Sequence, residues 1–243
     1  MIPLRDDNPT SRTAWVTIVL ILVNVGVYFL VQPGSTEIVA TAQFNYEHAA
    51  IPCEVTTGEP LSLDEIQPAL NGVSDHNCTS DSPLPPVFPG KHVFLAVLLS
   101  MFLHGSWLHL GGNMLFLWVF GNNIEDRLGP VRYLLFYVTA GVAATFTHVF
   151  LQPTSTIPVI GASGAIAGVM GAYLVWFPNA EVLSLLFIVV ARIRAKWWLL
   201  IWFASQFLIN PNEGVAWAAH VGGFVFGALL ALVGRTRRQP AST

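Results

Sequence analysis

Residues 161–177 read GASGAIAGVMGAYLVWF, an apolar stretch that is long enough for a membrane helix and rich in very small side chains. The small residues recur every fourth position along two neighbouring lines: Ser163, Ala167 and Gly171 on one, Gly164 and Gly168 on the other. Faces of this kind let two helix backbones approach closely within a bilayer. The stretch therefore predicts a helix that packs tightly against a partner and carries a serine near its start.

The expected partner is the stretch AAHVGGFVFGALLALVG at 218–234, which contains a histidine in otherwise apolar surroundings. His220 shares a helix face with Gly223 and Gly227, at i+3 and i+7. Packing of the two small-residue faces would bring the Ser163 hydroxyl beside the His220 imidazole at membrane depth. An activated serine with a histidine base is the minimal set of groups for acyl-transfer chemistry.

The composition indicates an integral membrane protein. Hydrophobic residues make up 53% of the 243 residues, charged residues only 10%, and the mean hydropathy is +0.59, which is too apolar for an ordinary soluble domain. Six stretches are predicted to span the bilayer: 13–31, 106–124, 131–151, 160–177, 196–210 and 214–233. The predicted fold is an all-α polytopic bundle of six transmembrane helices. A seventh apolar stretch, 93–103, is too short to cross and is expected in the interface or against the bundle.

The basic residues support this arrangement independently. Ten of the eleven fall on one side of the predicted bundle: Arg5, Arg12, Arg127, Arg132, Arg192, Arg194, Lys196, Arg235, Arg237 and Arg238. Only Lys91 falls on the other side. An excess of Lys and Arg marks cytoplasmic segments, so both termini are predicted to be cytoplasmic.

The domain organisation follows from these spans. We expect a cytoplasmic N-terminal tail at 1–12, a six-span membrane domain at 13–233 and a basic cytoplasmic tail at 234–243. The membrane domain contains a polar extracytoplasmic insert at 34–91. Ala40-Thr41-Ala42 resembles a signal-peptide cleavage site, but the preceding apolar core is longer than a signal sequence requires, so an uncleaved anchor is expected.

The insert contains both cysteines, Cys53 and Cys78, in a segment rich in proline and acidic residues. Two cysteines in one loop on the oxidising side of a membrane most simply form a disulfide. A metal pair is the lesser alternative, because no C-x-x-C or histidine spacing supports it. A weak apolar face predicts short helices around 61–70. The chain has no phosphate-binding glycine loop and no basic patch for nucleic acid.

Several mechanisms are disfavoured by what the spans lack. No aspartate or glutamate lies well inside a predicted span, whereas aspartyl intramembrane proteases and proton-coupled carriers require intramembrane carboxylates. A small-solute carrier is therefore a weak alternative. No H-E-x-x-H string is present, which argues against a zinc protease. Serine chemistry would have to proceed on a Ser-His dyad.

Four histidines lie at or near membrane depth, and they differ in context. His109 is followed at i+4 by Asn113, so the two polar side chains share one helix face. His148 and His104 have no comparable partner and are interpreted as hydrogen-bonded structural residues. A metal cluster of His104, His109 and His220 is disfavoured because the separation of five residues between the first two does not suit one helix face. We therefore expect no metal.

The chain resembles the rhomboid intramembrane serine proteases in their six-span bacterial form. The resemblance covers about residues 1–31 and 92–233, but not the insert between them. It rests on five motifs: IPLRDDNP at 2–9, FLHGSWLH at 102–109 followed by Asn113, GNNIEDRLG at 121–129, GASG at 161–164 and AHVGG at 219–223. Single motifs of this kind are weak, but their order on these spans is specific.

The resemblance implies a function and roles for four residues. Ser163 would be the nucleophile and His220 the general base and acid, while His109 and Asn113, with the Ser163 backbone N–H, would form the oxyanion hole. The implied partners are single-span transmembrane substrates, cut near the outer face of the cell membrane without a cofactor. The main alternative is a non-catalytic rhomboid-like protein that binds transmembrane helices.

Three positions depart from the pattern of the family. Leu95-Ala96 replaces a Trp-Arg pair, and Gly111-Gly112 precedes Asn113 where bulkier residues are usual. Ala167 stands where some members carry an aromatic residue that supports the histidine. None of these changes removes a reacting group. The third means that another side chain must orient His220, and Tyr173 or a tryptophan could do so.

Overall fold

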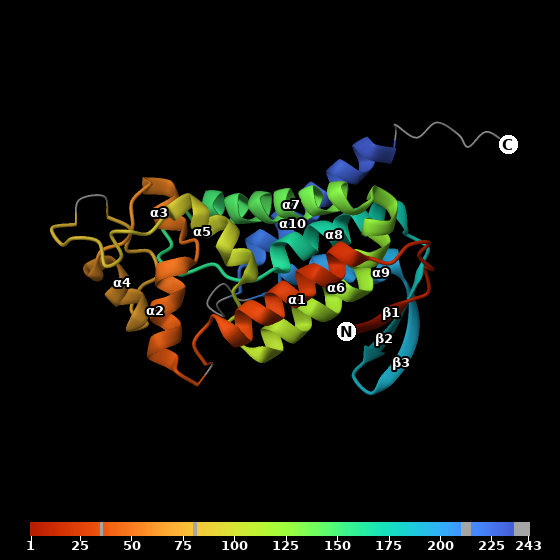
Figure 1. Ribbon diagram of the computed structural model, residues 1–243, viewed down its shortest axis with the longest axis horizontal. Helices are drawn as coiled ribbons and strands as arrows, with labels where there is room; N and C mark the ends of the chain where they lie inside the picture. Colours follow the sequence, from red (N-terminus) through yellow and green to blue (C-terminus); the bar gives the residue numbers. More distant parts are fainter. Residues whose placement is uncertain (35, 80–81, 210–214, 236–243) are drawn as a thin grey trace.

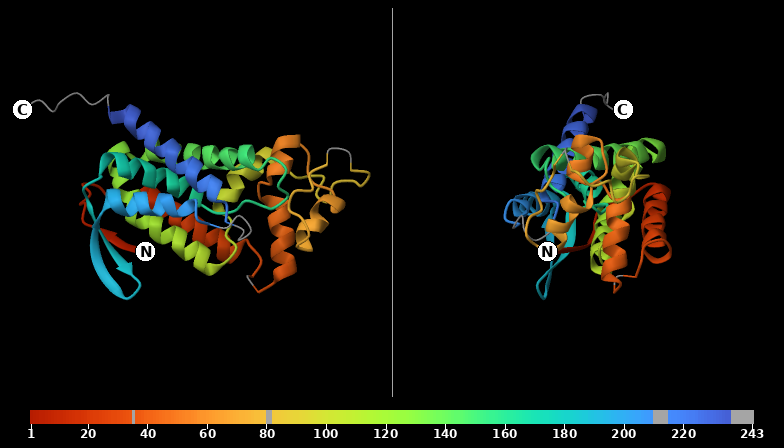
Figure 2. Two further views of the ribbon diagram at one scale, coloured as in Figure 1. Left: turned by 180° about the vertical axis from the view of Figure 1, so that it is seen from behind. Right: turned by 90° about the vertical axis from the view of Figure 1, so that its left-hand side faces the viewer.

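The computed structural model describes residues 1–34, 36–79, 82–209 and 215–235. Most of these residues are helical: α1 (Trp15–Leu30), α2 (Ile38–His48), α3 (Pro52–Thr57), α4 (Leu63–Leu70), α5 (Val93–Leu99), the 3-10 turn η1 (Ser100–Phe102), α6 (Trp107–Leu128), α7 (Pro130–Leu151), α8 (Ser163–Trp176), α9 (Ala195–Gln206) and α10 (Trp217–Arg235). The long helices form a bundle, with α2–α4 at one end and a small sheet at the other (Figures 1 and 2).

The centre of the bundle is α8, which packs against α6, α7, α9 and α10. Its residues from Gly164 to Tyr173 are all buried. The small side chains along α8 let neighbouring helices approach closely, which fits the position of the serine-bearing helix inside the bundle. Ser163 is its first residue.

The small-residue faces of α8 and α10 meet as the sequence predicts. A Cβ atom on Gly223 would collide with the carbonyl oxygen of Gly164, and one on Gly227 would collide with the backbone of Gly168. On α8, a Cβ on Gly171 would collide with the carbonyl of Phe224. The two backbones therefore touch directly, and this close approach sets the separation between Ser163 and His220.

Helix length and hydropathy identify fewer membrane spans than the six expected from the sequence. Among the described residues, α7 and α10 are each long and apolar enough to cross a membrane. The segment Val93–Phe102 and α6 would make a third span if taken together, although a 79° bend separates them. The apolar helices α1 and α8 are shorter, with 16 and 14 residues. At about 1.5 Å per residue α8 is roughly 21 Å long, less than the ~30 Å hydrocarbon core.

The fold is not entirely helical, which corrects the all-α prediction. The strands β1 (Ile2–Asp6), β2 (Glu181–Leu186) and β3 (Val189–Arg194) form an antiparallel sheet in the order β1-β2-β3. The sequence predicts a cytoplasmic tail at 1–12 and a basic connection between the spans 160–177 and 196–210, with no strand in either. Alternating residues of β2 and β3 pack on the bundle, including Val182 and Ile193, and this packing orders the two strands.

A hydrogen-bonded carboxylate fastens the sheet to the bundle. Asp6 Oδ2 accepts hydrogen bonds from Tyr173 Oη and Asn123 Nδ2, both at 2.6 Å. Desolvation raises the pKa of the Asp6 carboxyl, against the opposing effect of the Tyr173 hydrogen bond. The contact ties the start of the chain to α6 and to the far end of α8.

The insert forms a compact cap of α2, α3 and α4 with its own apolar core, and the Cys53–Cys78 disulfide joins α3 to the segment that follows α4. The bond confirms the predicted pairing, and α4 confirms the helix expected around 61–70. The other two helices were not predicted. Little in the sequence of α2 marks a helix, because its apolar face is weak and its N-terminus lacks a side-chain cap.

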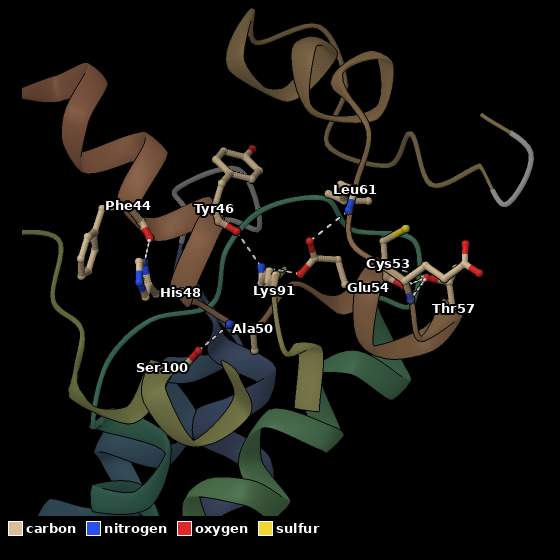
Figure 3. A network of polar contacts seen from close by, with 11 residues as sticks. Phe44, Tyr46, His48, Ala50, Cys53, Glu54, Thr57, Leu61, Lys91 and Ser100 are labelled. Carbon is tan, nitrogen blue, oxygen red and sulfur yellow. Dashed lines mark hydrogen bonds and ion pairs between the residues drawn. The ribbon is translucent and has the colours of Figure 1, made fainter. Parts of the chain in front are cut away.

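A buried ion pair holds the cap together (Figure 3). Lys91 Nζ lies 2.5 Å from Glu54 Oε2 and donates to the carbonyl oxygen of Tyr46 at 2.6 Å. The same carboxylate accepts from the backbone N–H of Leu61. Desolvation raises the pKa of Glu54 and lowers that of Lys91, while their mutual attraction opposes both shifts. Only 1% and 2% of the Lys91 and Glu54 side chains are exposed.

The cap is also bonded to the segment that leads into α8. The N–H of Cys53 donates to the carbonyl of Ser155 at 2.9 Å, and the N–H of Thr156 donates to the carbonyl of Asp75 at 2.8 Å. An isolated bridge pairs Ala50 with Val159. Cap residues near each of the two cysteines therefore form backbone hydrogen bonds with residues 155–159, the segment that precedes Ser163.

Candidate active site

Ser163 and His220 form the central contact of the site. Ser163 Oγ lies 2.8 Å from His220 Nε2, at hydrogen-bond distance. The serine begins α8, while the histidine lies in the first turn of α10. The start of a helix leaves its first backbone N–H groups without intrahelical partners and carries a partial positive charge. The structure therefore brings together the two residues that the sequence singled out.

The other nitrogen of the imidazole is held by a residue that the sequence analysis missed. Gln206 Oε1, on α9, lies 2.7 Å from His220 Nδ1. The amide nitrogen of Gln206 donates to the carbonyl of Trp202 at 3.0 Å, so its oxygen faces the histidine and accepts from Nδ1–H. This tautomer leaves Nε2 free to accept the proton of Ser163.

The expected supports of His220 are placed differently. Tyr173 lies toward the opposite end of α8 and bonds Asp6 rather than the histidine. A tryptophan does lie nearby, since the ring centroid of Trp202 is 6.0 Å from that of His220. The signal for Gln206 was present in the sequence as an uncharged polar residue in the apolar stretch 196–210. A single glutamine does not by itself indicate a site, because its partner His220 lies on another helix.

His109 and Asn113 lie on the same side of the site, both on α6. Asn113 Nδ2 donates to His104 Nε2 at 2.9 Å and retains a second N–H. His109 Nδ1 faces the N–H of Gly105 at 3.5 Å, which favours a proton on Nε2. Each side chain therefore retains an N–H group beyond those in these two contacts.

Gly161 brings the backbone before Ser163 against these two donors. Its φ of +120° favours glycine, and its N–H donates to the carbonyl of Ser100 at 2.9 Å. A Cβ atom at this position would lie 2.8 Å from His109 Nε2 and 3.5 Å from Asn113 Nδ2. A side chain would thus occupy the space that the donors border.

The remaining histidines differ in position. His104 is buried beside Asn113, and its backbone exchanges hydrogen bonds with the Gln32 side chain at 2.9 and 3.1 Å. This agrees with the structural role predicted for it. His148, also interpreted as structural, is buried and borders the same cavity as His109 and His220.

A cavity of about 400 Å³ connects these groups. The side chains that carry the proposed chemistry all line it: His109, Asn113, Ser163 and His220. Its wall also includes Asp75 of the cap and residues 157–160. The cavity is therefore bordered by both the bundle and the cap.

One group of potential metal ligands occurs among the described residues, and it lies away from this cavity. Cys53, Glu65 and Cys78 are close enough to share an ion. The two sulfur atoms are joined in the disulfide, which leaves no thiolate for a metal.

The arrangement supports nucleophilic acyl transfer. A hydroxyl lies against an imidazole nitrogen, the opposite nitrogen is fixed by an acceptor, and donors border the adjoining space. These are the groups that a serine nucleophile, its base and an oxyanion need.

Comparison with known proteins agrees with the motifs. A family model described as a rhomboid domain matches residues 91–237. The chain is 30% identical over 140 residues to Rhomboid protein 1, mitochondrial, of Saccharomyces cerevisiae, and 31% identical over 155 residues to the Rhomboid protease AarA of Providencia stuartii. These matches cover 56% and 55% of this chain.

A third relative is Presenilin-associated rhomboid-like protein A, mitochondrial, of Danio rerio, which is 34% identical over 143 residues, or 55% of this chain. The three matches cover 40%, 53% and 36% of the yeast, Providencia and zebrafish proteins. The chain thus spans about half or less of the relatives it matches.

Proposed function

This chain belongs to the rhomboid family, and we propose that it is a serine endopeptidase that cleaves transmembrane helices within the bilayer. The observation that carries the proposal is the 2.8 Å contact between Ser163 Oγ and His220 Nε2. The relative named a rhomboid protease adds support. The proposed location is the bacterial cell membrane, with six spans and both termini in the cytoplasm.

The first chemical step is attack by Ser163 on the scissile carbonyl. His220 Nε2 takes the hydroxyl proton as the oxygen–carbon bond forms, and Gln206 holds the resulting imidazolium through Nδ1–H. The carbonyl oxygen becomes an oxyanion that His109, Asn113 and the Ser163 N–H stabilise.

Collapse of this tetrahedral species breaks the peptide bond. His220 returns its proton to the departing amine, and the N-terminal part of the substrate remains as an ester on Ser163. Water then attacks the ester, again with His220 as base, and releases the carboxylate product. In this proposal the water comes through the cavity, whose wall includes the polar side chains of Asp75, Gln152 and Ser155.

The proposed substrates are single-span membrane proteins cut near the outer face. A helix hides its scissile carbonyl in an i→i−4 hydrogen bond, so the cleaved segment must unwind before attack. Substrates with glycine, proline or β-branched residues near the cut should be preferred, because these residues weaken a helix.

The proposal is tested with purified protein in proteoliposomes that contain a single-span reporter. The comparison is between the parent, Ser163→Ala and Ser155→Ala, whose serine contributes to the same cavity. Product from the parent and from Ser155→Ala, with none from Ser163→Ala, supports the proposal. Equal product from the parent and Ser163→Ala would overturn it. Reporter binding without product from any variant would instead indicate a helix-binding protein.

A further inference from the structure

The turn between β2 and β3 exposes two large apolar side chains. Phe187 and Ile188 form this turn, and they are 99% and 92% exposed. The next two residues, Val189 and Val190, are also more than half exposed. Such a continuous apolar tip marks an interaction site rather than a scattered surface residue.

The sheet is apolar at its tip end and charged at its base. The exposed residues near the tip are Met1, Ile2, Leu4, Phe187, Ile188, Val189 and Val190. The residues toward the base include Arg5, Asp6, Asp7, Glu181, Arg192 and Arg194. Polarity therefore changes along the strands, as it does with depth across the surface of a bilayer.

The tip cannot be buried by folding back onto the bundle. β1 pairs with β2 along its length, and Asp6 bonds Tyr173 and Asn123. Val182 and Ile193 pack into the core at the base of the hairpin. The sheet is thus fixed at its base while its tip points outward.

The position of the sheet places this tip beside the bilayer. The sheet lies at the end of the bundle opposite the cap and projects sideways from it (Figures 1 and 2). β3 runs directly into α9, and Trp15 and Trp197 are exposed at the nearby ends of α1 and α9. Exposed tryptophans of this kind are typical of the membrane–water interface.

We propose that the β2–β3 turn inserts into the bilayer surface and that nearby cations contact phospholipid phosphates. Arg5 and Arg192 are paired with Asp7. Among the described residues neither Arg194 nor Lys196 forms an ion pair, and the Lys196 ammonium lies over the Trp197 ring, 5.5 Å from its centroid. Neither positive charge is neutralised by a carboxylate there, so both can attract anionic headgroups. The bilayer is the occupant we favour, because the change from apolar tip to charged base follows the depth profile of a bilayer surface and exposed tryptophans lie beside it.

The insertion is measured with an environment-sensitive dye on single introduced cysteines in nanodiscs of phosphatidylcholine and phosphatidylglycerol. The native cysteines form a disulfide and do not react under non-reducing conditions. Ile188→Cys is the test site. Leu22→Cys on the exposed face of α1 is the membrane reference, and Glu59→Cys in the cap is the aqueous reference.

The expected result is that dye at position 188 is quenched by nitroxide lipids and protected from iodide, as at Leu22. Iodide quenching within twofold of that at Glu59, without quenching by nitroxide lipids, would overturn the proposal. Efficient oxidative cross-linking between two Ile188→Cys chains would also overturn it, because a second copy would then cover the tip.

The headgroup contact has a separate readout. Phosphatidylglycerol should increase protection of the dye at position 188 several-fold over phosphatidylcholine alone. The variant R194Q/K196Q should lose most of that difference, whereas E181Q, at the same base of the sheet, should retain it. Equal protection in both lipids would exclude the proposed contact with anionic headgroups. No proteolysis is measured, so failure here is distinct from failure of the proposed enzyme activity.

Discussion

The imidazole of His220 is held at both ring nitrogens, by Ser163 on α8 and Gln206 on α9. A serine protease triad uses a carboxylate in the second position to fix the tautomer and orient the ring. Here a neutral amide occupies that position, and it is itself oriented by the Trp202 carbonyl. Ser163, His220 and Gln206 are thus linked in series, although no aspartate or glutamate lies well inside the predicted spans.

Replacing Gln206 tests this orientation. Gln206→Leu places an apolar side chain of similar size in this buried position and removes the acceptor for Nδ1–H. A hydrogen bond to the charged imidazolium contributes ~1.5–3 kcal/mol, so kcat for reporter cleavage should fall about 10- to 150-fold. Gln206→Glu retains an oxygen acceptor and should stay closer to the parent. Equal loss in both variants, measured per folded molecule, would contradict an orienting role.

The donors at His109 and Asn113 lead to a second prediction. Loss of one oxyanion donor typically lowers kcat by about 10²–10³, so Asn113→Ala and His109→Ala should each retain weak, measurable cleavage. Because both act on one oxyanion, the double variant should lose less than the product of the single losses. If cleavage by both single variants stays within a few-fold of the parent, the assignment is wrong.

At the residue scale, four candidate site residues could be predicted from the sequence, because each lies in a motif or on a helix face with a recognisable partner: Ser163, His220, His109 and Asn113. Gln206 could not be predicted in this way, because its partner His220 is fourteen residues away on another helix. Nor did it show that Gly161 lies against His109, because that contact depends on how α6 meets the start of α8. Such contacts follow from packing, which local sequence patterns do not encode.

At the scale of helices, α8 and α10 approach until their backbones touch. In Gly227→Ala the added methyl group would meet the backbone of Gly168. Overpacking of this kind costs about 1–3 kcal/mol and should separate Ser163 from His220. We expect a lower midpoint of thermal unfolding and lower cleavage per folded molecule. Gly26→Ala on α1 is the matched control, since nothing lies within 4 Å of its added Cβ. Equal stability of the two variants would contradict the close packing.

The buried Lys91–Glu54 pair gives a prediction for the cap. Lys91→Met leaves the Glu54 carboxylate buried without its cation, and breaking such a pair costs about 3–5 kcal/mol. Cap amides should therefore exchange faster with deuterium in this variant. Replacing both residues, as in K91M/E54L, should restore part of the protection, because no buried charge remains. Greater loss in the double variant would contradict this account.

The stability of the cap in the single variant Lys91→Met should depend on pH in a defined direction. Burial already raises the pKa of Glu54 above its usual value, and removal of Lys91 takes away the attraction that opposes this shift. With a folded pKa above the unfolded one, stability is present at low pH and falls as pH rises through the folded pKa. Cap protection in Lys91→Met should be greater near pH 5 than near pH 8.

At the scale of the molecule, the sequence predicted a helical membrane bundle and, in the cap, the disulfide and α4, but not α2, α3 or the sheet at the other end. Helical hydropathy and small-residue spacing act over one segment, so they revealed the α8–α10 pair. The sheet unites the start of the chain with residues 181–194, and the cap rests on contacts between its short helices and residues 155–159. These arrangements depend on distant parts of the chain. The cap thereby reaches the segment before Ser163, which connects the disulfide-closed insert to the site.

The central claim is that Ser163 is a nucleophile activated by His220, and it is tested directly by covalent labelling in proteoliposomes. A fluorophosphonate should modify the parent at one residue, identified by peptide mass spectrometry as Ser163. His220→Ala should lose most of the labelling rate while remaining folded by thermal unfolding. Labelling at another serine, or an undiminished rate in folded His220→Ala, would contradict the account.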